Sequence, residues 1–444
     1  MIPCIDILSL VQEGFQFLRS VITDLQLRNL MLIATAVILQ SRFNLSQVSR
    51  SWLKERSVNA FSHALMRMKI NLDEAAHAYA KMLQSRYELG GGRFIIDDTL
   101  EHHSRLCRFI HGVCKHWDHV FRTHLSAQCL VFLYYCEGEW VKFPIGWRIY
   151  FKGGQKTKND LAVQLIEEAL KRGFPCEVVL ADSWYCVEPF IRELRRLGLK
   201  YLAEIKTNAT VRIPIAKGNG KRRSRKRTKW YRTENIVSVM GRVRKQRVIG
   251  FVGDLDTGKA EKVLYELKEK ICVLNALPGR HKVVYSYDAQ KGTEKYLITN
   301  ALNWEGVKVV REYFKRWVIE EFFRNAKQQL NMEGACVRSE QGVAIKLLLV
   351  TCVDSLFHMQ IAKLVSGDSQ SGPITVQSVI RLAELENAEN FVQLIKSPAG
   401  ERFLKKWLAQ LQKDAIRKRK VKSAVEYLDQ GGEVYMEEAS ERAA

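Results

Sequence analysis

The hydrophobic period of the chain changes at three consecutive glycines, residues 90–92, and this change constrains the fold more than any other feature. The residues before it are rich in good helix formers and contain one proline, at position 3. After it, Arg93–Asp97 (RFIID) is a short apolar run that ends in acid, as buried strands often are. The segments that follow predict two strands, a helix, a strand, a helix and a strand, at 125–136, 140–151, 159–173, 176–182, 187–198 and 200–206. This order predicts an α/β fold, a mixed sheet with helices packed on it.

Composition shifts divide the chain of 444 residues into further segments, as expected for a chain too long for one ordinary core. We predict an all-helical N-terminal domain at 1–90, the first part of the sheet core at 91–206, a mainly β insertion with a basic loop at 207–300, the remainder of the core at 301–370, and a basic helical region with an acidic tail at 371–444.

The N-terminal segment contains three expected helices. An apolar helix at 30–42 is followed by polar segments at 44–58 and 59–68, with Asn44 or Ser46 capping the first of these and Asn59 the second. The pattern fits a helix-turn-helix-like unit that binds DNA ends, and it fits an ordinary helical bundle equally well. The basic setting favours contact with DNA.

The charge of the chain indicates a polyanionic partner. Seventy Lys and Arg against 48 Asp and Glu give a formal net charge of +22. Nucleic acid is the expected polyanion, and an anionic membrane surface is the alternative. We expect no membrane span, since the best apolar run, Leu30–Leu39, is shorter than the ~20 residues that a span needs. Ten cysteines without a C-x-x-C pair indicate free thiols in a reducing compartment, and the bacterial cytoplasm fits.

Two acids follow apolar runs that predict buried strands. Asp97 ends the first run and Asp182 ends Cys176–Asp182 (CEVVLAD). If the strands are neighbours, both carboxylates lie at the carboxyl edge of the sheet, where they form a hard-oxygen site for Mg²⁺. The alternative is that either Asp caps a turn or helix, and Asp182 before Ser183 fits that role too.

A long amphipathic helix predicted at 309–330 carries Tyr313, Arg316, Glu320 and Lys327 on one face. Glu320 is suited to ligate metal, Arg316 and Lys327 to grip phosphates, and Tyr313 to hydrogen-bond a DNA backbone oxygen. The alternative is an exposed face on which Arg316 pairs with Glu320, four residues away. We expect the opposite face, with Phe314, Trp317, Val318 and Phe322, to be buried.

These motifs resemble those of bacterial insertion-sequence transposases of the IS-four type. The resemblance covers roughly residues 90–360. It rests on IIDDT at the first acid, VVLADSWY at the second, and the helix signature of Tyr313, Arg316, Glu320 and Lys327. It implies a ribonuclease-H-like core interrupted by a β insertion, and Asp97, Asp182 and Glu320 as catalytic ligands of two Mg²⁺ or Mn²⁺ ions. Asp98 is the alternative to Asp97. We prefer Asp97, because Asp97 directly follows the apolar run.

The resemblance implies a DNA transposase that cuts the ends of a mobile element and joins the 3′-hydroxyl ends to target DNA. It also implies a homodimer on paired ends and a hairpin at the excised end. A metal-dependent nuclease of the same fold and a non-catalytic DNA-binding derivative are the alternatives. Further expected DNA contacts are Lys206, after a core strand, and a basic run at 217–229 that includes Lys221, Arg222, Arg223, Arg225, Lys226 and Arg227. A cluster of six histidines with Cys107 and Cys114, at 102–124, matches no common zinc-finger spacing.

Overall fold

The computed structural model describes residues 2–409 except 54–56, 104–108, 215–230, 254–259, 336, 368–373, 399, 403 and 406. One compact unit spans Pro3–Asn387, and a second begins at Ala388, within α12 (Val376–Lys396). The first unit holds the sheet and all the predicted catalytic residues.

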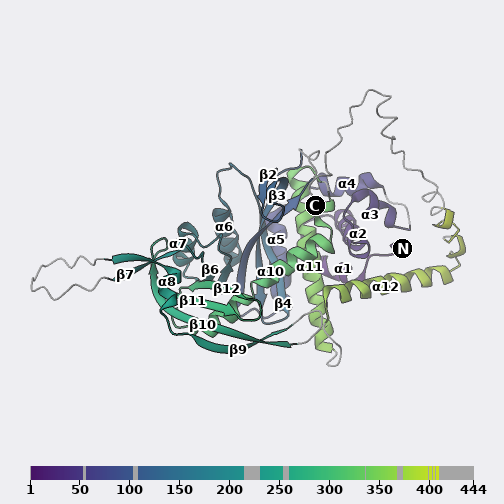
Figure 1. Ribbon diagram of the computed structural model, residues 1–444. Helices are drawn as coiled ribbons and strands as arrows, with labels where there is room; N and C mark the ends of the chain where they lie inside the picture. The colour runs from purple at the N-terminus through teal and green to yellow at the C-terminus, as the bar shows by residue number, and fades with distance from the viewer. Residues whose placement is uncertain are drawn as a thin grey trace, which may run out of the picture. The chain divides into compact units, whose positions relative to one another are not determined.

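The centre of the sheet places five strands in the spatial order β4 (Val141–Tyr150), β3 (Thr123–Glu137), β1 (Gly92–His102), β5 (Cys176–Ala181) and β6 (Lys200–Glu204). Figure 1 labels β3, β4 and β6 of this group. β4, β3 and β1 pair antiparallel, whereas β1, β5 and β6 pair parallel. A sheet with this order and these directions is consistent with the ribonuclease-H-like fold that the sequence predicts. The prediction that the first strand ends at Asp97 is wrong, because β1 continues to His102.

The segment after β6 extends this same sheet. β12 (Thr293–Thr299) pairs antiparallel with β6, and the sheet continues outward through β11 (Arg280–Asp288) and β10 (Ala260–Leu274). The sheet is completed by β7 (Thr210–Pro214), β8 (Tyr231–Asn235), β9 (Gln246–Gly253) and, next to β3, β2 (Val113–Asp118). A short helix, α8 (Ile236–Gly241), follows β8. The residues predicted as a β insertion are therefore continuous with the core by hydrogen bonding.

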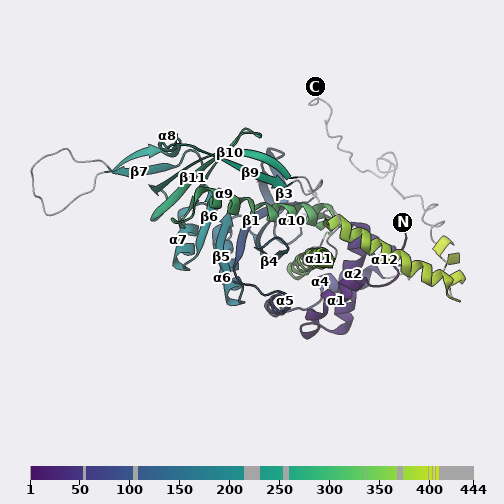
Figure 2. The same cartoon turned by 90° about the horizontal axis from the view of Figure 1, so that it is seen from below.

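Helices cover both faces of the central strands (Figure 2). α6 (Lys158–Lys171) and α7 (Glu188–Arg196) lie on one face, and α9 (Gly306–Phe314), α10 (Trp317–Gln328) and α11 (Glu340–Gly367) on the other. Side chains along β3 alternate between these two faces. The Phe132 ring lies 5.0 Å from the ring of Phe322 in α10, whereas the Tyr135 ring lies 5.5 Å from Phe174, which follows α6. β1, between β3 and β5, is therefore buried on both faces.

The first 90 residues form helices that belong to the same compact unit as the sheet. They are α1 (Ser9–Gly14), η1 (Gln16–Ser20), α2 (Asp24–Gln40), α3 (Leu45–Ser51), α4 (Val58–Met66) and α5 (Leu72–Arg86), and several of them pack on α11. Asn44 caps α3, as predicted, by accepting hydrogen bonds from the backbone N–H groups of Ser46 and Gln47. The predicted cap at Asn59 is wrong, because α4 already begins after Ser57.

α11 is the buried core helix that the sequence predicts at 344–365. It is long and apolar enough to cross a membrane by length and composition, and 94% of its apolar window is buried inside the protein. Lys346 of α11 forms a buried ion pair with Glu101 of β1, so this helix is fixed to the strand that carries the first acid.

Candidate active site

Asp97 and Asp182 lie at equivalent positions of two neighbouring parallel strands. The pairing of β1 with β5 aligns Ile96 with Ala181. Asp97 is the next residue of β1, and Asp182 directly follows the end of β5. Burial and the nearby Asp182 carboxylate raise the pKa of Asp97 to about 7. The two carboxylates repel each other. The pairing of β1 with β5 nevertheless fixes them side by side.

Asp182 also holds the turn that follows β5. Its Oδ1 accepts hydrogen bonds from the backbone N–H of Trp184 at 2.9 Å and from that of Tyr185 at 3.3 Å. Burial raises the pKa of Asp182 in spite of these two donors. The side chain does not cap α7, whose N-cap residue is Val187. The sequence leaves two alternatives for Asp182, a turn residue or a member of the acid cluster. In the structure it is both, because it caps this turn and lies beside Asp97.

The long helix predicted at 309–330 is broken into α9 and α10, so that prediction is wrong. The break lies at Lys315 and Arg316, whose backbone N–H groups bond three residues back, to Glu312 and Tyr313, at 3.2 and 3.0 Å. This local 3₁₀-type tightening rotates α10 relative to a continuous helix. Phe314 and Trp317, expected to be buried, are 47% and 54% exposed.

Arg316 lies at this break and bridges two of the predicted catalytic acids. Its Nη1 donates to Asp97 Oδ2 at 2.8 Å, and its Nη2 donates to Glu320. The predicted pairing of Arg316 with Glu320 is thus confirmed. The Nε atom of the same guanidinium is buried and has no hydrogen-bond partner among the residues that the structure describes. The arrangement joins Glu320 to Asp97 through a cation rather than through direct contact.

The other two residues of the signature contact protein groups in this structure. The Tyr313 hydroxyl donates to Glu204 Oε2 at 3.1 Å, and the same oxygen accepts from Lys295 Nζ at 2.6 Å. Lys327 Nζ donates to the backbone carbonyl of Leu100 in β1 at 2.7 Å. The sequence interpretation did not select Glu204. A signal was present, because Glu204 is the last residue of β6 and follows an apolar run, as Asp97 and Asp182 do.

The remaining predicted DNA contacts are Lys206 and the basic run at 217–229. Lys206 is exposed, two residues after β6 ends. The basic residues of the run at 217–229 lie outside the described residues: Lys221, Arg222, Arg223, Arg225, Lys226 and Arg227.

Asp98 has a separate set of partners. Its Oδ2 accepts from Lys158 Nζ at 2.7 Å, and its Oδ1 accepts from the Tyr185 hydroxyl at 3.1 Å. Burial by itself lowers the pKa of Lys158, but the Asp98 carboxylate outweighs this and raises it. The sequence interpretation missed both partners, although Tyr185 lies within the motif VVLADSWY and Lys158 directly follows the capping residue Thr157.

The acids fit a divalent cation in their chemistry. Carboxylate oxygens are preferred ligands of Mg²⁺, and a cation beside Asp97 and Asp182 would relieve the repulsion that contributes to the raised pKa of Asp97. Arg316 already places positive charge there. Among the residues that the structure describes, no three His, Cys, Asp or Glu side chains are grouped as metal ligands, and Arg316 forms ion pairs with both Asp97 and Glu320.

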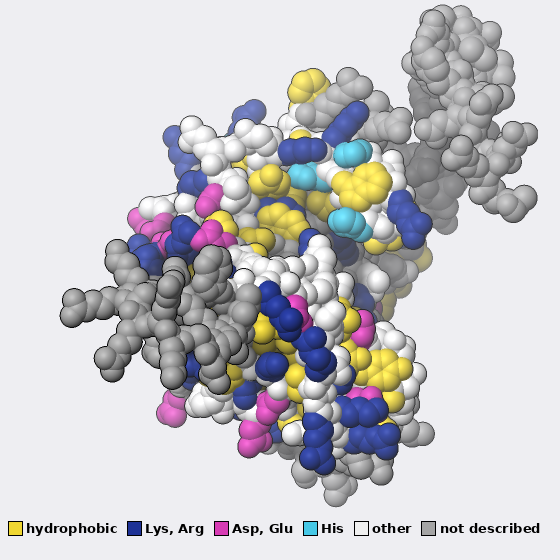
Figure 3. Space-filling model, turned by 60° about the vertical axis from the view of Figure 1, so that its left-hand side comes forward, with side chains coloured by type: hydrophobic (Ala, Val, Ile, Leu, Met, Phe, Trp, Pro, Cys, Tyr) yellow, Lys and Arg dark blue, Asp and Glu magenta, His cyan; other side chains and the backbone are white. Residues whose placement is uncertain are grey.

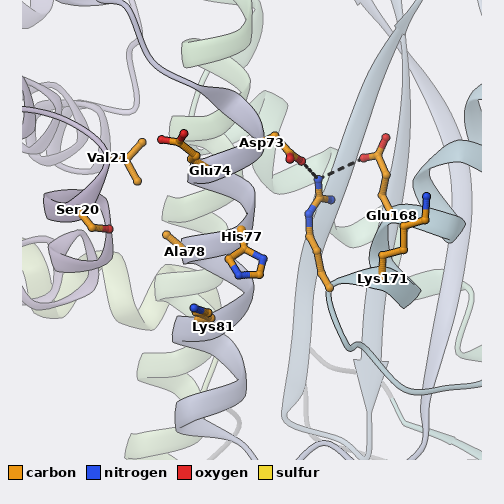
Figure 4. Close-up of a pocket in the computed structure, with 10 residues that line it drawn as sticks. Ser20, Val21, Asp73, Glu74, His77, Ala78, Lys81, Glu168 and Lys171 are labelled. Atoms are coloured by element: carbon orange, nitrogen blue, oxygen red, sulfur yellow. Dashed lines mark hydrogen bonds and ion pairs between the residues drawn. The ribbon is translucent and has the colours of Figure 1, made fainter.

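A surface cavity of about 510 Å³ lies elsewhere, between α5 and α6 (Figure 4). Arg172 bridges Asp73 and Glu168 across it, with His77 and Lys81 on the α5 side. None of the predicted catalytic residues lines this cavity. Its wall is charged and open, and the bridge is an ordinary surface ion pair.

The sheet order and the half-buried carboxylates at two neighbouring strands define an α/β protein with a cluster of acids. Comparison with protein families makes the class specific. The model of the transposase DDE domain matches residues 144–353, which include Asp182 and Glu320. The model of the DDE superfamily endonuclease matches residues 26–247, which include Asp97 and Asp182. The chain belongs to the DDE superfamily of transposases and endonucleases, and is an enzyme of that class. No curated protein matches the sequence.

Proposed function

We propose that this protein is a DNA transposase that cuts the ends of a mobile element and joins the resulting 3′-hydroxyl ends to target DNA. The observation that carries the proposal is the half-buried pair of Asp97 and Asp182 with Glu320 attached through Arg316, in a chain of the DDE superfamily. The helix signature supports assignment to the IS-four type. Cutting and joining are both phosphoryl transfers, so one acid centre can serve both steps.

Asp97, Asp182 and Glu320 are assigned as ligands of two divalent ions, Mg²⁺ or Mn²⁺. The superfamily is generally dependent on divalent metal. Two bound ions stabilise the entering and leaving oxygens of a phosphoryl displacement. β1 supplies Asp97, the turn directly after β5 supplies Asp182, and α10 supplies Glu320. Asp182 is further oriented by its two backbone donors.

Arg316 has two roles in succession in this proposal. In the free protein it holds Asp97 and Glu320 as a built-in cation. When DNA enters, the guanidinium leaves the carboxylates for a backbone phosphate, which offers it bidentate hydrogen bonds and a partner for Nε. Lys327 grips a second phosphate, and Tyr313 hydrogen-bonds a backbone oxygen after the bond to Glu204 is given up.

The partners follow from charge and from the family. The net charge of +22 supports binding to double-stranded DNA at both the element ends and the target. The helices of residues 1–90 are proposed to contact the element end, and the basic run at 217–229 and Lys206 to contact DNA phosphates without reading sequence. We propose a homodimer on paired ends, a hairpin at the excised end, and a location in the bacterial cytoplasm, at the nucleoid.

The test is cleavage and joining by the full-length protein on DNA that carries the sequences flanking its gene. Cleavage requires Mg²⁺ or Mn²⁺ and stops in EDTA, and pre-cut ends with a 3′-hydroxyl are joined to a target plasmid. Cleavage without joining would make the protein a nuclease of the same fold. Binding without metal-dependent cleavage would make it a non-catalytic derivative, and cleavage in EDTA would contradict the metal centre.

A further inference from the structure

The tip of the β2–β3 hairpin exposes a group of large apolar side chains close to the acid-bearing strand. β2 pairs with β3 up to Asp118 opposite Thr123, and the chain turns through residues 119–122. Val120 is 86% exposed, Phe121 63% and Trp117 47%. Figure 3 shows apolar and histidine side chains with Lys and Arg beside them at the top of the face, the end where β2 and β3 are labelled in Figure 1. Such a group of exposed apolar side chains needs a partner.

This tip is fixed rather than loosely attached. Asp118 Oδ1 accepts hydrogen bonds from the backbone N–H of Val120 at 2.7 Å and from that of Phe121 at 2.9 Å. These donors hold the pKa of Asp118 below its ordinary value, and the N–H of Phe121 contributes most. The turn is therefore capped by a carboxylate anion. The tip therefore presents Val120 and Phe121 in one backbone conformation.

The same cap connects the tip to β1 and to the helix signature. Asp118 Oδ2 lies 2.8 Å from His102 Nε2, and the Phe121 ring meets the His102 ring edge-on at 5.8 Å. His102 Nδ1 lies 3.6 Å from Glu333, which is 3.7 Å from Lys327 Nζ. His102 follows Asp97 by five residues on β1, about 17 Å along an extended strand. That distance corresponds to roughly five base steps of B-DNA.

The charge around the tip complements a polyanion. Between residues 109 and 124 the sequence has a single acid, Asp118, and its side chain is buried in the interactions just described. The exposed polar residues there are Lys115, His119, Arg122, Thr123 and His124, and none of them is acidic. Apolar side chains surrounded by cations suit a DNA duplex, in which bases accept apolar wedges and phosphates accept cations.

We propose that the hairpin tip is a wedge whose Phe121, supported by Val120, inserts between base pairs of the DNA on which the acid centre acts, while Arg122 and Lys115 contact the flanking phosphates. The inference rests on the proposed function, in that the partner is DNA. It adds a second DNA contact on a different element from the helix signature. Its role is to distort and position the duplex about five base steps from the acids, since an inserted apolar side chain unstacks one base step and kinks the DNA.

The experiment uses the full-length protein and short blunt-ended duplexes, each with one fluorescent adenine analogue at a successive position from the end. Bound wild-type protein raises the fluorescence at one or two interior positions, because the analogue is unstacked there. Phe121→Ala removes the rise and weakens binding by about tenfold, as expected for loss of one base–aromatic contact. Phe121→Trp restores both. Trp140→Ala is the matched control, since Trp140 is 40% exposed at the turn after β3, and it changes neither signal.

The outcomes separate the inference from the proposed function. If wild-type protein binds and cleaves DNA but unstacks no position, the wedge is wrong and the proposed function stands. If it binds no DNA at all, both fail. If Phe121→Ala leaves the fluorescence rise unchanged and instead abolishes self-association in light scattering, the tip is an interface between copies of the chain and the wedge is wrong. Unchanged melting temperatures verify that each variant is folded, as expected for exposed positions.

Discussion

Asp97 and Asp98 are adjacent on β1, yet their carboxylates lie on opposite faces of the sheet in different surroundings. Asp98 has a dedicated cation, Lys158, and a hydroxyl donor, Tyr185, and both come from the α6 and α7 side. Asp97 faces α10, has Asp182 beside it, and shares its cation Arg316 with Glu320. The raised pKa of Asp97 reflects burial next to another acid with incomplete compensation. In the proposed function, Asp97 exchanges its shared cation for metal, whereas Asp98 keeps Lys158 and Tyr185 as its partners.

The largest expected difference between the two acids is in cleavage. Asp97→Asn removes a metal ligand and lowers the rate on the order of a thousandfold or more, since metal ions supply several kcal/mol of transition-state stabilisation. Asp98→Asn keeps the acid centre and lowers the rate by about tenfold or less. Nicking of supercoiled plasmid in Mg²⁺ measures both, and Asp182→Asn and Glu320→Gln serve as inactive references that still bind DNA. The reverse ranking would make Asp98 the ligand.

The next effect is on the pH dependence of stability without metal. The pKa of Asp97 rises from 3.8 to about 7 on folding, so its contribution to stability is complete below pH 3.8 and is lost as the pH rises through about 7. The loss amounts to about 4 kcal/mol. Asp97→Asn therefore flattens the decline in unfolding free energy between pH 4 and 7 in EDTA, measured by denaturant titration, and Asp98→Asn does not. An unchanged slope in Asp97→Asn would show that Arg316 fully compensates the carboxylate.

A smaller effect distinguishes the two assigned roles of Arg316. If the guanidinium competes with metal, Arg316→Ala binds Mn²⁺ about tenfold more tightly in the absence of DNA, a change of about 1.4 kcal/mol. The same variant loses productive positioning of the DNA end. Calorimetric titration with Mn²⁺, with and without DNA, measures both, with Glu320→Ala as the variant whose metal site is damaged. Weakening of metal binding to the same extent as in Glu320→Ala would show that Arg316 orients the ligand instead.

The smallest expected effect lies on the Asp98 face. Asp98 and Lys158 are each 17% exposed in their side chains and form a single close pair. A double-mutant cycle with Asp98→Asn and Lys158→Met gives a coupling of about 1 kcal/mol in unfolding free energy. The same cycle on Mn²⁺ affinity gives no coupling. A coupling in metal affinity would place Asp98 in the metal centre and remove the distinction between the two faces.

Much of the core could be predicted because its signals are local. The apolar runs before Asp97 and Asp182, the helix at 159–173 and the core helix at 344–365 each follow from periodicity and flanking residues within one segment. The break between α9 and α10 could not be predicted in this way. Its sequence carries no proline or glycine, and Arg316 is placed by its contacts with Asp97 and Glu320, which lie on other turns and strands.

The sequence by itself determined the order of strands and helices, the three acids worth testing and the net charge that favours DNA. These depend on hydrophobic period and residue type, which are properties of short segments. Only the tertiary structure decided that Asp97 and Asp98 face different partners, that Arg316 stands between two acids, and that the hairpin tip is tied to β1 through His102. These depend on strand register and on contacts between residues as far apart as 97 and 316, which no local pattern encodes.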